Sequence, residues 1–581
     1  MNLSSKRRFG FISLDRFFSF TDSLKPSDRL VFKVLFYIFA ISALIGLFLL
    51  SRGFLTNVPA SGGVLIEGAI GAPRFINPVL AITRADNDLL ALTHSGLMRL
   101  SPDGTLVNDL AESVTISEDG LVYNVVMRTD RRWHDNTPVT AEDVAFTIAL
   151  IQKPEVKSPI LGNWSGVTVE LIGKHEINFV LENPYTPFIE NLTVGILPKH
   201  VWDTLSDEEF PFSHRNIEPI GSGPYKVHAV KRTPAGLISE YDLRVADDYK
   251  DEANIKRVIV RYYQNEDAVL SALNKGEINA TASLSERHLS SLDRDLFKLM
   301  SEPLPRVFSV FYNQNKATVL RDKAVRDALD VSIDRAELVK RAVDGYGRPT
   351  NTPLPPGWAN LEDTVSDDQY GSNEERLNAA RDMLRAAGWR QNTTGRWEKT
   401  IDEVVMPLAF TVRSANGPLF EKIASYLTET WQTLGVDVTV ELYEQSDLVQ
   451  TIIRPRDYQA LLFGVDVGRS LDLYPFWHSS GREDPGLNVS LYANITIDRL
   501  VTDMRVATST ETRDTLIGQF VQEIDTEHPA TFLFTPSFEY VLRSNIRVTD
   551  MKRLQKPSER FLNISEWHMN ESGVWPIFNN N

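Results

Sequence analysis

Hydrophobic and polar residues change their spacing along this chain, and these changes predict its elements. Apolar and polar residues alternate from Leu121 to Arg128, which is typical of a half-buried strand entered through the tight turn Asp119-Gly120. The Thr140 hydroxyl, with Asp143 three residues on, can cap a helix that begins at Ala141. This stretch therefore predicts a hairpin followed by a helix.

The second half of the chain alternates strands with helices. Leu408 to Arg413 predicts a strand, Leu419 to Leu434 a helix that ends at Gly435, and Val436 to Tyr443 a second strand. Such a strand-helix-strand order predicts parallel pairing within an α/β lobe. Tyr458 to Val465 predicts a further buried strand.

The longest apolar run, Val34 to Leu50, carries no charge and is long enough to span a bilayer if residues 31–33 extend it. Seven of the eight basic residues up to Arg52 precede it, which predicts a cytoplasmic head over residues 1–30. A signal peptide cleaved near Val58-Pro59-Ala60 is the alternative. We favour an uncleaved anchor, because both the run and the head before it are long.

Charge and cysteine content narrow the function. The net charge is −16 over 581 residues, with no long basic run, which argues against a nucleic-acid partner. The chain contains no cysteine, so disulfides, thiolate metal sites, a cysteine nucleophile and a lipid-modified N-terminal cysteine are excluded. The ten histidines are scattered without metal-site spacing, and no cofactor is expected. At this length, two or three lobes are expected.

Two motifs carry a resemblance. One is Trp133-His134-Asp135-Asn136-Thr137-Pro138 with the Thr140-Ala141-Glu142-Asp143-Val144 helix start, and the other is Gly221-Ser222-Gly223-Pro224-Tyr225. Both resemble the family 5 solute-binding proteins, the peptide- and nickel-binding receptors of ABC importers. Asn136 stands where glycine is common, and asparagine tolerates the positive φ that the turn requires. We expect both motifs to be structural. The second motif is not a phosphate loop, because Gly-Lys-Ser/Thr is missing and a proline follows.

The resemblance covers Gly63 to about Ile564 and implies a two-lobed α/β fold of the periplasmic-binding-protein type II, with an inserted subdomain, after one transmembrane helix. Val307 to Tyr312 and Thr531 to Thr535 would be the crossings between lobes. The expected boundaries are 1–30 for the head, 31–50 for the anchor, 51–62 for a linker, 63–105 with 219–306 and 536–581 for lobe I, 106–218 for the inserted subdomain and 307–535 for lobe II.

The candidate ligand-binding residues follow a buried strand. In peptide-binding relatives an aspartate in this region accepts the α-ammonium group of the ligand, and Asp472 matches it by position, with Asp466 second. A carboxylate in a cleft that excludes water as it closes forms a strong charge-assisted hydrogen bond to a cation. Alternatively, Asp472 caps a short helix that begins near Leu473. Asn313 is a further candidate, at the end of the first crossing.

Tyr474, Trp477 and Trp164 are the candidate pocket walls, because aromatic rings provide contact area at low rotamer cost. For each ring alone, a place in the core is the alternative. His478 is the residue to examine if the ligand is nickel.

The resemblance implies an extracytoplasmic receptor, anchored in the cell membrane by a single pass, that binds a peptide-like solute and delivers it to ABC permease subunits. A monomer without catalytic residues is expected. The alternatives are a nickel or metal-chelate receptor and an anchored hydrolase with Glu112 and Asp135 as paired carboxylates. The hydrolase is disfavoured because nothing fixes these carboxylates at a useful separation and no Gly-x-Ser-x-Gly elbow is present.

Overall fold

The computed structural model describes residues 25–53, 55–249, 252–358, 370–401, 403–507, 509–549 and 552–574. The chain divides into two compact units, residues 1–60 with 569–581, and residues 61–568. Most of the predicted cytoplasmic head lies outside the described residues.

The first unit contains the predicted anchor. Helix α2 (Pro26–Gly53) is long and apolar enough over Ser27–Gly46 to cross a membrane, and none of that stretch is buried. Strand β1 (Thr56–Ala60) pairs antiparallel with β23 (Asn570–Val574). The last strand therefore pairs with the segment after the helix, whereas the sequence boundaries assign residues 536–581 to lobe I.

The second unit is built on one twelve-stranded sheet. Its main path runs β20-β19-β21-β14-β22-β12-β2-β11-β10-β9, and β13 and β15 both pair with β22. The strands are β2 (Val64–Ile70), β9 (Tyr225–Arg232), β10 (Ile238–Val245), β11 (Arg257–Tyr263), β12 (Ala280–Thr281), β13 (Phe297–Pro303), β14 (Arg306–Tyr312), β15 (Gly347–Pro349), β19 (Ala409–Ala415), β20 (Asp437–Tyr443), β21 (Ala460–Asp466) and β22 (Ala530–Arg543).

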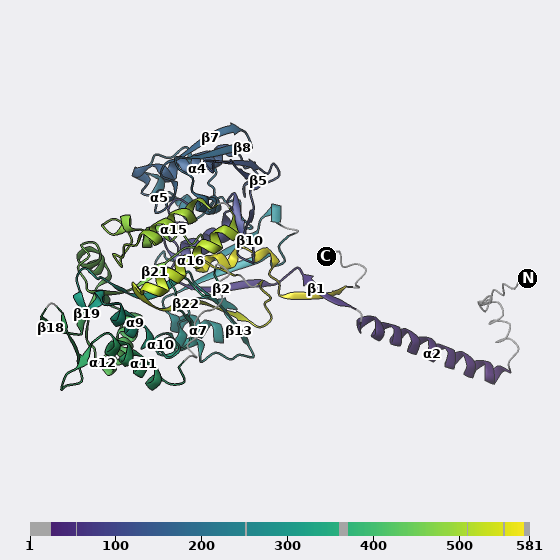
Figure 1. The fold of residues 1–581 in the computed structure, drawn as a ribbon. Coiled ribbons are helices and arrows are strands. Elements are labelled where there is room, and N and C mark those ends of the chain that lie inside the picture. The colour runs from purple at the N-terminus through teal and green to yellow at the C-terminus, as the bar shows by residue number, and fades with distance from the viewer. Residues whose placement is uncertain are drawn as a thin grey trace, which may run out of the picture. The chain divides into compact units, whose positions relative to one another are not determined.

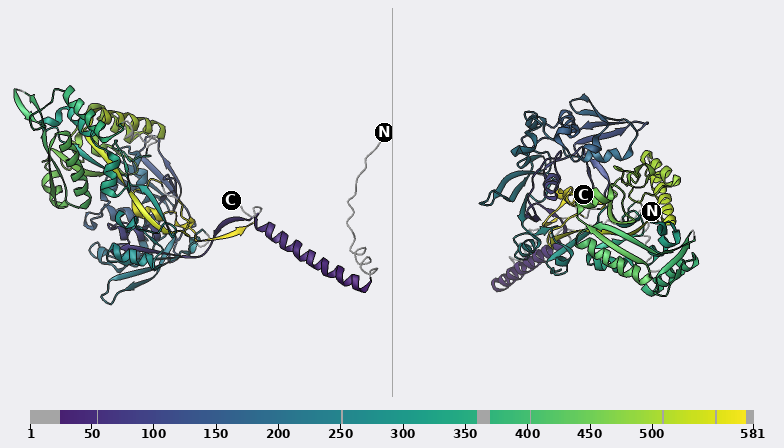
Figure 2. Two further views of the ribbon diagram at one scale, coloured as in Figure 1. Left: turned by 90° about the horizontal axis from the view of Figure 1, so that it is seen from below. Right: turned by 90° about the vertical axis from the view of Figure 1, so that its left-hand side faces the viewer.

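Strand β22 belongs to both lobes. Its first residues pair with β14, with Phe308 opposite Phe534, and its later residues pair with β13, with Lys298 opposite Leu542. Figure 2 shows it as a long yellow strand that runs through the second unit. The two predicted crossings therefore correspond to β14 and the first half of β22.

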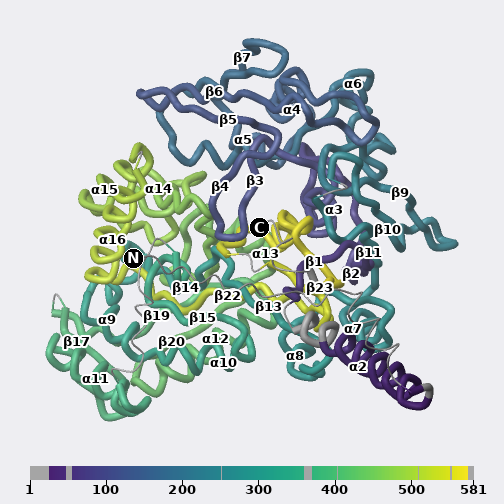
Figure 3. The backbone as a smooth tube through the Cα atoms, turned by 90° about the vertical axis from the view of Figure 1, so that its right-hand side faces the viewer, coloured from purple at the N-terminus to yellow at the C-terminus, as the bar shows by residue number. Residues whose placement is uncertain are grey.

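The second lobe has the predicted α/β order. Strands β19 and β20 are parallel and joined by α12 (Pro418–Leu434), which ends at Gly435 with φ of +103°. Two further helices of this lobe are α9 (Lys323–Val331) and α10 (Arg335–Val343), and the Asp334 carboxylate caps the second. Figure 3 shows α9, α10, α11 (Asn373–Ala386) and α12 gathered around β19 and β20.

The inserted subdomain has its own antiparallel sheet, in the order β5 (Ala111–Ile116), β6 (Val122–Met127), β8 (Glu176–Leu181), β7 (Val167–Gly173). Helix α4 (Ala141–Gln152) covers it (Figure 1). The predicted hairpin and helix start are confirmed, with Gly120 at φ of +70° and the Thr140 N–H donating to Asp143 over 2.9 Å. The core of the subdomain also includes Val79, Leu80, Leu97 and Met98, which precede the expected boundary at residue 106.

The two motifs meet each other. The His134 ring contacts the carbonyl oxygen of Gly223 through Nε2 at 3.0 Å, and its Nδ1 accepts from the Gly221 N–H at 3.2 Å. A Cβ atom on Gly221 would lie 1.8 Å from the carbonyl oxygen of Thr93, so only glycine fits. Asn136 has φ of +71°, as the turn requires. Both motifs hold the inserted subdomain against the first lobe.

Candidate ligand-binding site

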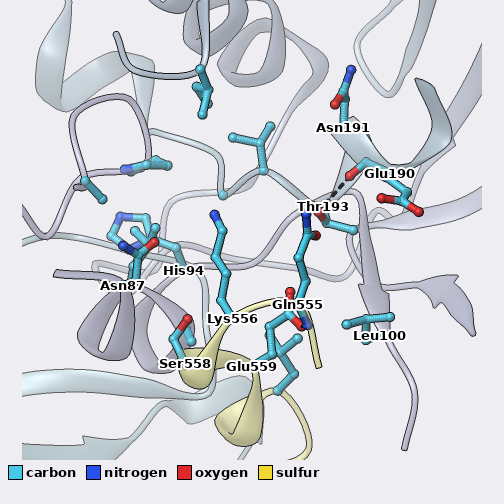
Figure 4. Close-up of a pocket in the computed structure, with 18 of the residues that line it drawn as sticks. Asn87, His94, Leu100, Glu190, Asn191, Thr193, Gln555, Lys556, Ser558 and Glu559 are labelled. Atoms are coloured by element: carbon cyan, nitrogen blue, oxygen red, sulfur yellow. Dashed lines mark hydrogen bonds between the residues drawn. The ribbon is translucent and has the colours of Figure 1, made fainter. Parts of the chain in front are cut away.

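A cavity of about 260 Å³ is lined by segments far apart in the sequence. Its walls come from α3 (Arg84–Thr93) and the residue after it, from α5 (Leu161–Trp164), from the 3-10 segment Thr186–Thr193, from Arg469 after β21, and from the C-terminal segment around η10 (Pro557–Phe561). Both lobes and the inserted subdomain therefore contribute to it. Figure 4 shows side chains of the first lobe and of the inserted subdomain around it, among them His94, Lys556 and Glu190. A cavity where domains meet is a common position for a small-molecule site.

The charged groups on its wall are only partly paired. Arg469 and Glu559 form an ion pair of 2.6 Å, with 8% and 14% of their side chains exposed, and Glu559 also accepts from the Gln555 N–H. Glu190 and Lys556 line the same cavity, and neither side chain has a hydrogen bond or ion pair to the described residues. Burial raises the pKa of Glu190 to about 7, against the opposing effect of Arg469 and Arg513.

His94 contributes a buried acceptor. The Thr93 hydroxyl donates its hydrogen to the carbonyl oxygen of Leu89 over 2.8 Å. Its oxygen must therefore accept from His94 Nδ1, 2.9 Å away. This fixes the tautomer and leaves a lone pair on Nε2, which has no partner among the described residues. Burial lowers the pKa of His94 to about 3, so the ring is neutral at physiological pH.

A buried ion cluster supports this wall. Arg560 is fully buried and donates to Asp88 on α3 at 2.8 Å and to Glu67 on β2 at 2.9 Å. Tyr540 also donates to Glu67, over 2.9 Å. The cluster joins the segment that carries Lys556 to the helix that precedes His94, so both cavity walls are held at a fixed separation.

Asp472 lies at a contact between the inserted subdomain and the second lobe. Arg505 binds its carboxylate bidentately at 2.9 and 2.8 Å, and the Tyr185 hydroxyl donates to it at 3.1 Å. The N–H of Tyr474, the first residue of the short helix α14 (Tyr474–Trp477), donates to it at 3.3 Å, but the N-cap residue of that helix is Leu473. The Arg505 guanidinium therefore already pairs with the carboxylate that the sequence analysis assigns to the ammonium group of a ligand. That assignment stays a prediction, and it requires Arg505 to move.

The other predicted pocket walls have different surroundings. Trp164 lines the cavity, but it is 1% exposed and packs on Phe179 and Phe188 at centroid distances of 5.7 and 5.5 Å. Trp477 is 3% exposed in the core of the second lobe, against Phe311, Phe520 and Phe532. It is not among the residues that line the cavity, so its surroundings are those of the core alternative.

Tyr474 and His478 lie near Asp472. The Arg505 guanidinium is 3.9 Å from the centroid of the Tyr474 ring. The His478 ring stacks on the Tyr474 ring, with 4.1 Å between the two centroids. Asn313 is 1% exposed and binds backbone groups, donating to the Arg456 carbonyl oxygen. Its surroundings are those of a structural turn.

Asp466 ends β21 and accepts from the Gly468 N–H at 3.1 Å, with Arg306 at 3.8 Å. Of the carboxylates considered for hydrolysis, Glu112 is exposed on β5, and Asp135 lies 2.8 Å from the His200 ring. Neither of them lines the cavity. Within the described part of the chain, no group of three or more histidine, aspartate or glutamate side chains is arranged to hold a metal ion.

Sequence reasoning missed Glu190, His94 and Lys556. Each is an isolated polar residue in a short or irregular segment, and no periodic spacing distinguishes them from surface residues. The tertiary structure alone brings them to one cavity.

A mixed α/β scaffold whose lobes share the long strand β22, with a cavity lined by both lobes, defines a solute-binding protein. Residues 105–485 match the profile of the bacterial extracellular solute-binding proteins, family 5. The chain belongs to this family, as its motifs indicated.

Individual relatives agree with this. The oligopeptide-binding protein AppA of Bacillus subtilis is 27% identical over 519 residues, which are 88% of this chain and 92% of AppA. The structure of AppA in complex with a nonapeptide is 26% identical, has a TM-score of 0.63, and matches 88% of this chain and 99% of its own. NikZ from Campylobacter jejuni in complex with Ni(L-His) is 25% identical, with a TM-score of 0.63, and the match covers 87% of this chain and 99% of the NikZ chain. The open form of the murein tripeptide-binding protein MppA shares the fold, with a TM-score of 0.73 and 18% identity. That match covers 88% of this chain and 98% of the MppA chain.

Proposed function

We propose that this protein is a membrane-tethered receptor of an ABC importer, which captures peptide-like solutes between its lobes and delivers them to the permease. The observation that carries the proposal is the cavity, whose walls come from both lobes and the inserted subdomain and present unpaired polar groups on a family 5 scaffold. The similarity to oligopeptide-binding relatives supports a peptide ligand. Capture needs binding and no bond cleavage, so no catalytic role is proposed.

The mechanism we propose is hinge closure. Strands β14 and β22 connect the lobes, and Tyr185, Asp472 and Arg505 form a contact at which the inserted subdomain meets the second lobe. A ligand that touches both sides favours the arrangement in which they are close, and this arrangement would dock on the permease. The receptor works as a monomer in this proposal.

The tether is α2. Its apolar stretch Ser27–Gly46 is unburied, and basic residues precede it, which supports an uncleaved anchor with the binding unit outside the cytoplasm. The intact mass of the protein recovered from membranes tests this. A mass that includes residues 1–60 supports the anchor, whereas a chain that begins after Ala60 establishes a signal peptide.

Native mass spectrometry of the full chain, purified in detergent, tests the ligand class. Co-purified masses that form a series of peptides support the proposal. A nickel-chelate mass would favour the second candidate, a metal-chelate receptor, which the likeness to NikZ supports and for which His478 is the predicted residue. Peptides that are bound and then cleaved would refute a pure receptor.

A further inference from the structure

The stretch of chain that follows the apolar helix α2 is a paired strand. Only residues 54 and 55 separate the end of α2 from β1, and all five residues of β1 pair with β23 without a register shift. The side-chain amide of Asn57 also donates to the Glu571 carboxylate, 514 residues further on, over 3.2 Å. The last described strand of the chain therefore returns to the segment next to the predicted anchor.

The two segments that lead into this ribbon are held together within the second unit. The Gly62 N–H donates to the carbonyl oxygen of Asn254 over 2.9 Å, and the Asn254 N–H donates to the carbonyl oxygen of Ser565 over 3.2 Å. The Asn254 side-chain amide reaches the same Ser565 oxygen at 3.4 Å. A two-stranded ribbon is marginally stable by itself, and joining its ends at one residue lowers the entropy cost of pairing.

The ribbon contains a segment whose composition suits a protease. Val58-Pro59-Ala60 has small residues on both sides of a proline, and a cut after Ala60 would separate residues 61–581 from α2. Val58 and Ala60 are only half-buried, and Pro59 is exposed. Burial of side chains therefore gives little protection. Pairing of the backbone gives more, because a protease must reach the backbone of an extended, unpaired chain.

We propose that β23 protects the receptor against release from the membrane, by pairing with β1 and keeping the segment Val58-Pro59-Ala60 from being cleaved. This inference rests on the proposed tether and adds a means of keeping it intact. While the ribbon is closed, one backbone edge of β1 is occupied by β23. Cleavage then requires the ribbon to open, and its rate follows the fraction of molecules in which the ribbon is open.

Limited proteolysis of the full chain in detergent tests the proposal. Elastase is the probe, because its small specificity pocket accepts residues such as Ala60. A variant that ends at Met569 lacks β23, and a variant that ends at Val574 keeps it and is the matched control. We expect the first variant to be cut after Ala60 at least tenfold faster than the wild type, and the control to be cut at the wild-type rate. Intact mass identifies the product, which begins at Ser61.

A covalent lock gives a second readout that does not shorten the chain. Thr56 and Val574 lie opposite each other in the ribbon, so their Cα atoms are close enough for a disulfide. The natural chain has no cysteine, so Thr56→Cys with Val574→Cys introduces the only two thiols. We expect elastase to cut the oxidised form after Ala60 several-fold more slowly than the reduced form. Equal rates for the two forms would overturn the proposal.

The outcomes separate this inference from the proposed tether. If the variant that ends at Met569 is cut after Ala60 no faster than the wild type, β23 does not protect the segment, and an anchored receptor stands without this device. If the wild type recovered from membranes already begins at Ser61, both the tether and the protection are overturned. Equal melting temperatures of the two shortened variants are expected, because both retain residues 61–568 of the second unit.

Discussion

The ion pair between Asp472 and Arg505 gives the sharpest test of how the lobes hold a ligand. Asp472 accepts two hydrogen bonds from Arg505 and one from Tyr185, which belongs to the inserted subdomain. Arg505 also lies 5.5 Å from the Tyr185 ring centroid. We expect Asp472→Asn and Arg505→Gln to weaken peptide binding alike, because each loosens the same contact.

The expected loss of peptide affinity follows from the geometry of this contact. A hydrogen bond to a charged group contributes about 1.5–3 kcal/mol. The Arg505 side chain is 31% exposed and that of Asp472 is 11% exposed, so solvent screening favours the lower value. A loss of about 1.5 kcal/mol corresponds to roughly a tenfold lower affinity. Tyr185→Phe removes only the neutral donor and should cost less, about threefold.

Calorimetric titration of the full chain with the peptide that co-purifies with it measures all three variants. The opposite hypothesis is that Asp472 receives the ligand ammonium and Arg505 competes with it. In that case Asp472→Asn weakens binding while Arg505→Gln, which frees the carboxylate, tightens it. Opposite signs for these two variants would refute the contact argument and establish Asp472 as the ligand's partner.

Three further predictions concern the frame that carries the cavity. Arg560→Met leaves Glu67 and Asp88 buried without their cation, and should lower the free energy of unfolding by about 3–5 kcal/mol in urea titrations. Arg257→Met is the control, at an exposed ion pair whose arginine is 43% exposed, and should leave the free energy of unfolding almost unchanged. Gly221→Ala should destabilise the protein by more than about 2 kcal/mol, because its Cβ would meet the Thr93 carbonyl oxygen. Gly162→Ala is the control and should be almost neutral, because the space around Gly162 is open. Equal melting temperatures for the two variants would refute the close contact between Gly221 and Thr93. Burial raises the pKa of Glu539 to about 7, so the stability that its protonated form contributes is complete below the usual pKa of about 4.5 and is lost as the pH rises through 7. Glu539→Gln should therefore be more stable than the wild type at pH 8, by about 2 kcal/mol, and equal to it at pH 4; an unchanged difference across this range would contradict the prediction.

The sequence by itself determined the elements whose hydrogen bonds are local. The turn at Asp119-Gly120, the positive φ of Asn136 and the capped start of α4 at Thr140 each depend on residues only a few positions apart, so the chain encodes them directly. The parallel β19-α12-β20 unit followed from periodicity. The two motifs then identified the family, and through it the two-lobed fold.

Only the tertiary structure decided which polar groups are paired and which are free. From the sequence, Asp472 was a candidate to bind the ammonium group of a ligand, but in the fold Arg505, 33 residues further on, pairs with it. Arg560 finds Glu67 across 493 residues. Glu190, His94 and Lys556 look like ordinary surface positions until folding brings them to one cavity. The physical reason is that a side chain's partners are set by the packing of distant segments, whereas hydropathy and capping patterns report only the nearest neighbours along the chain.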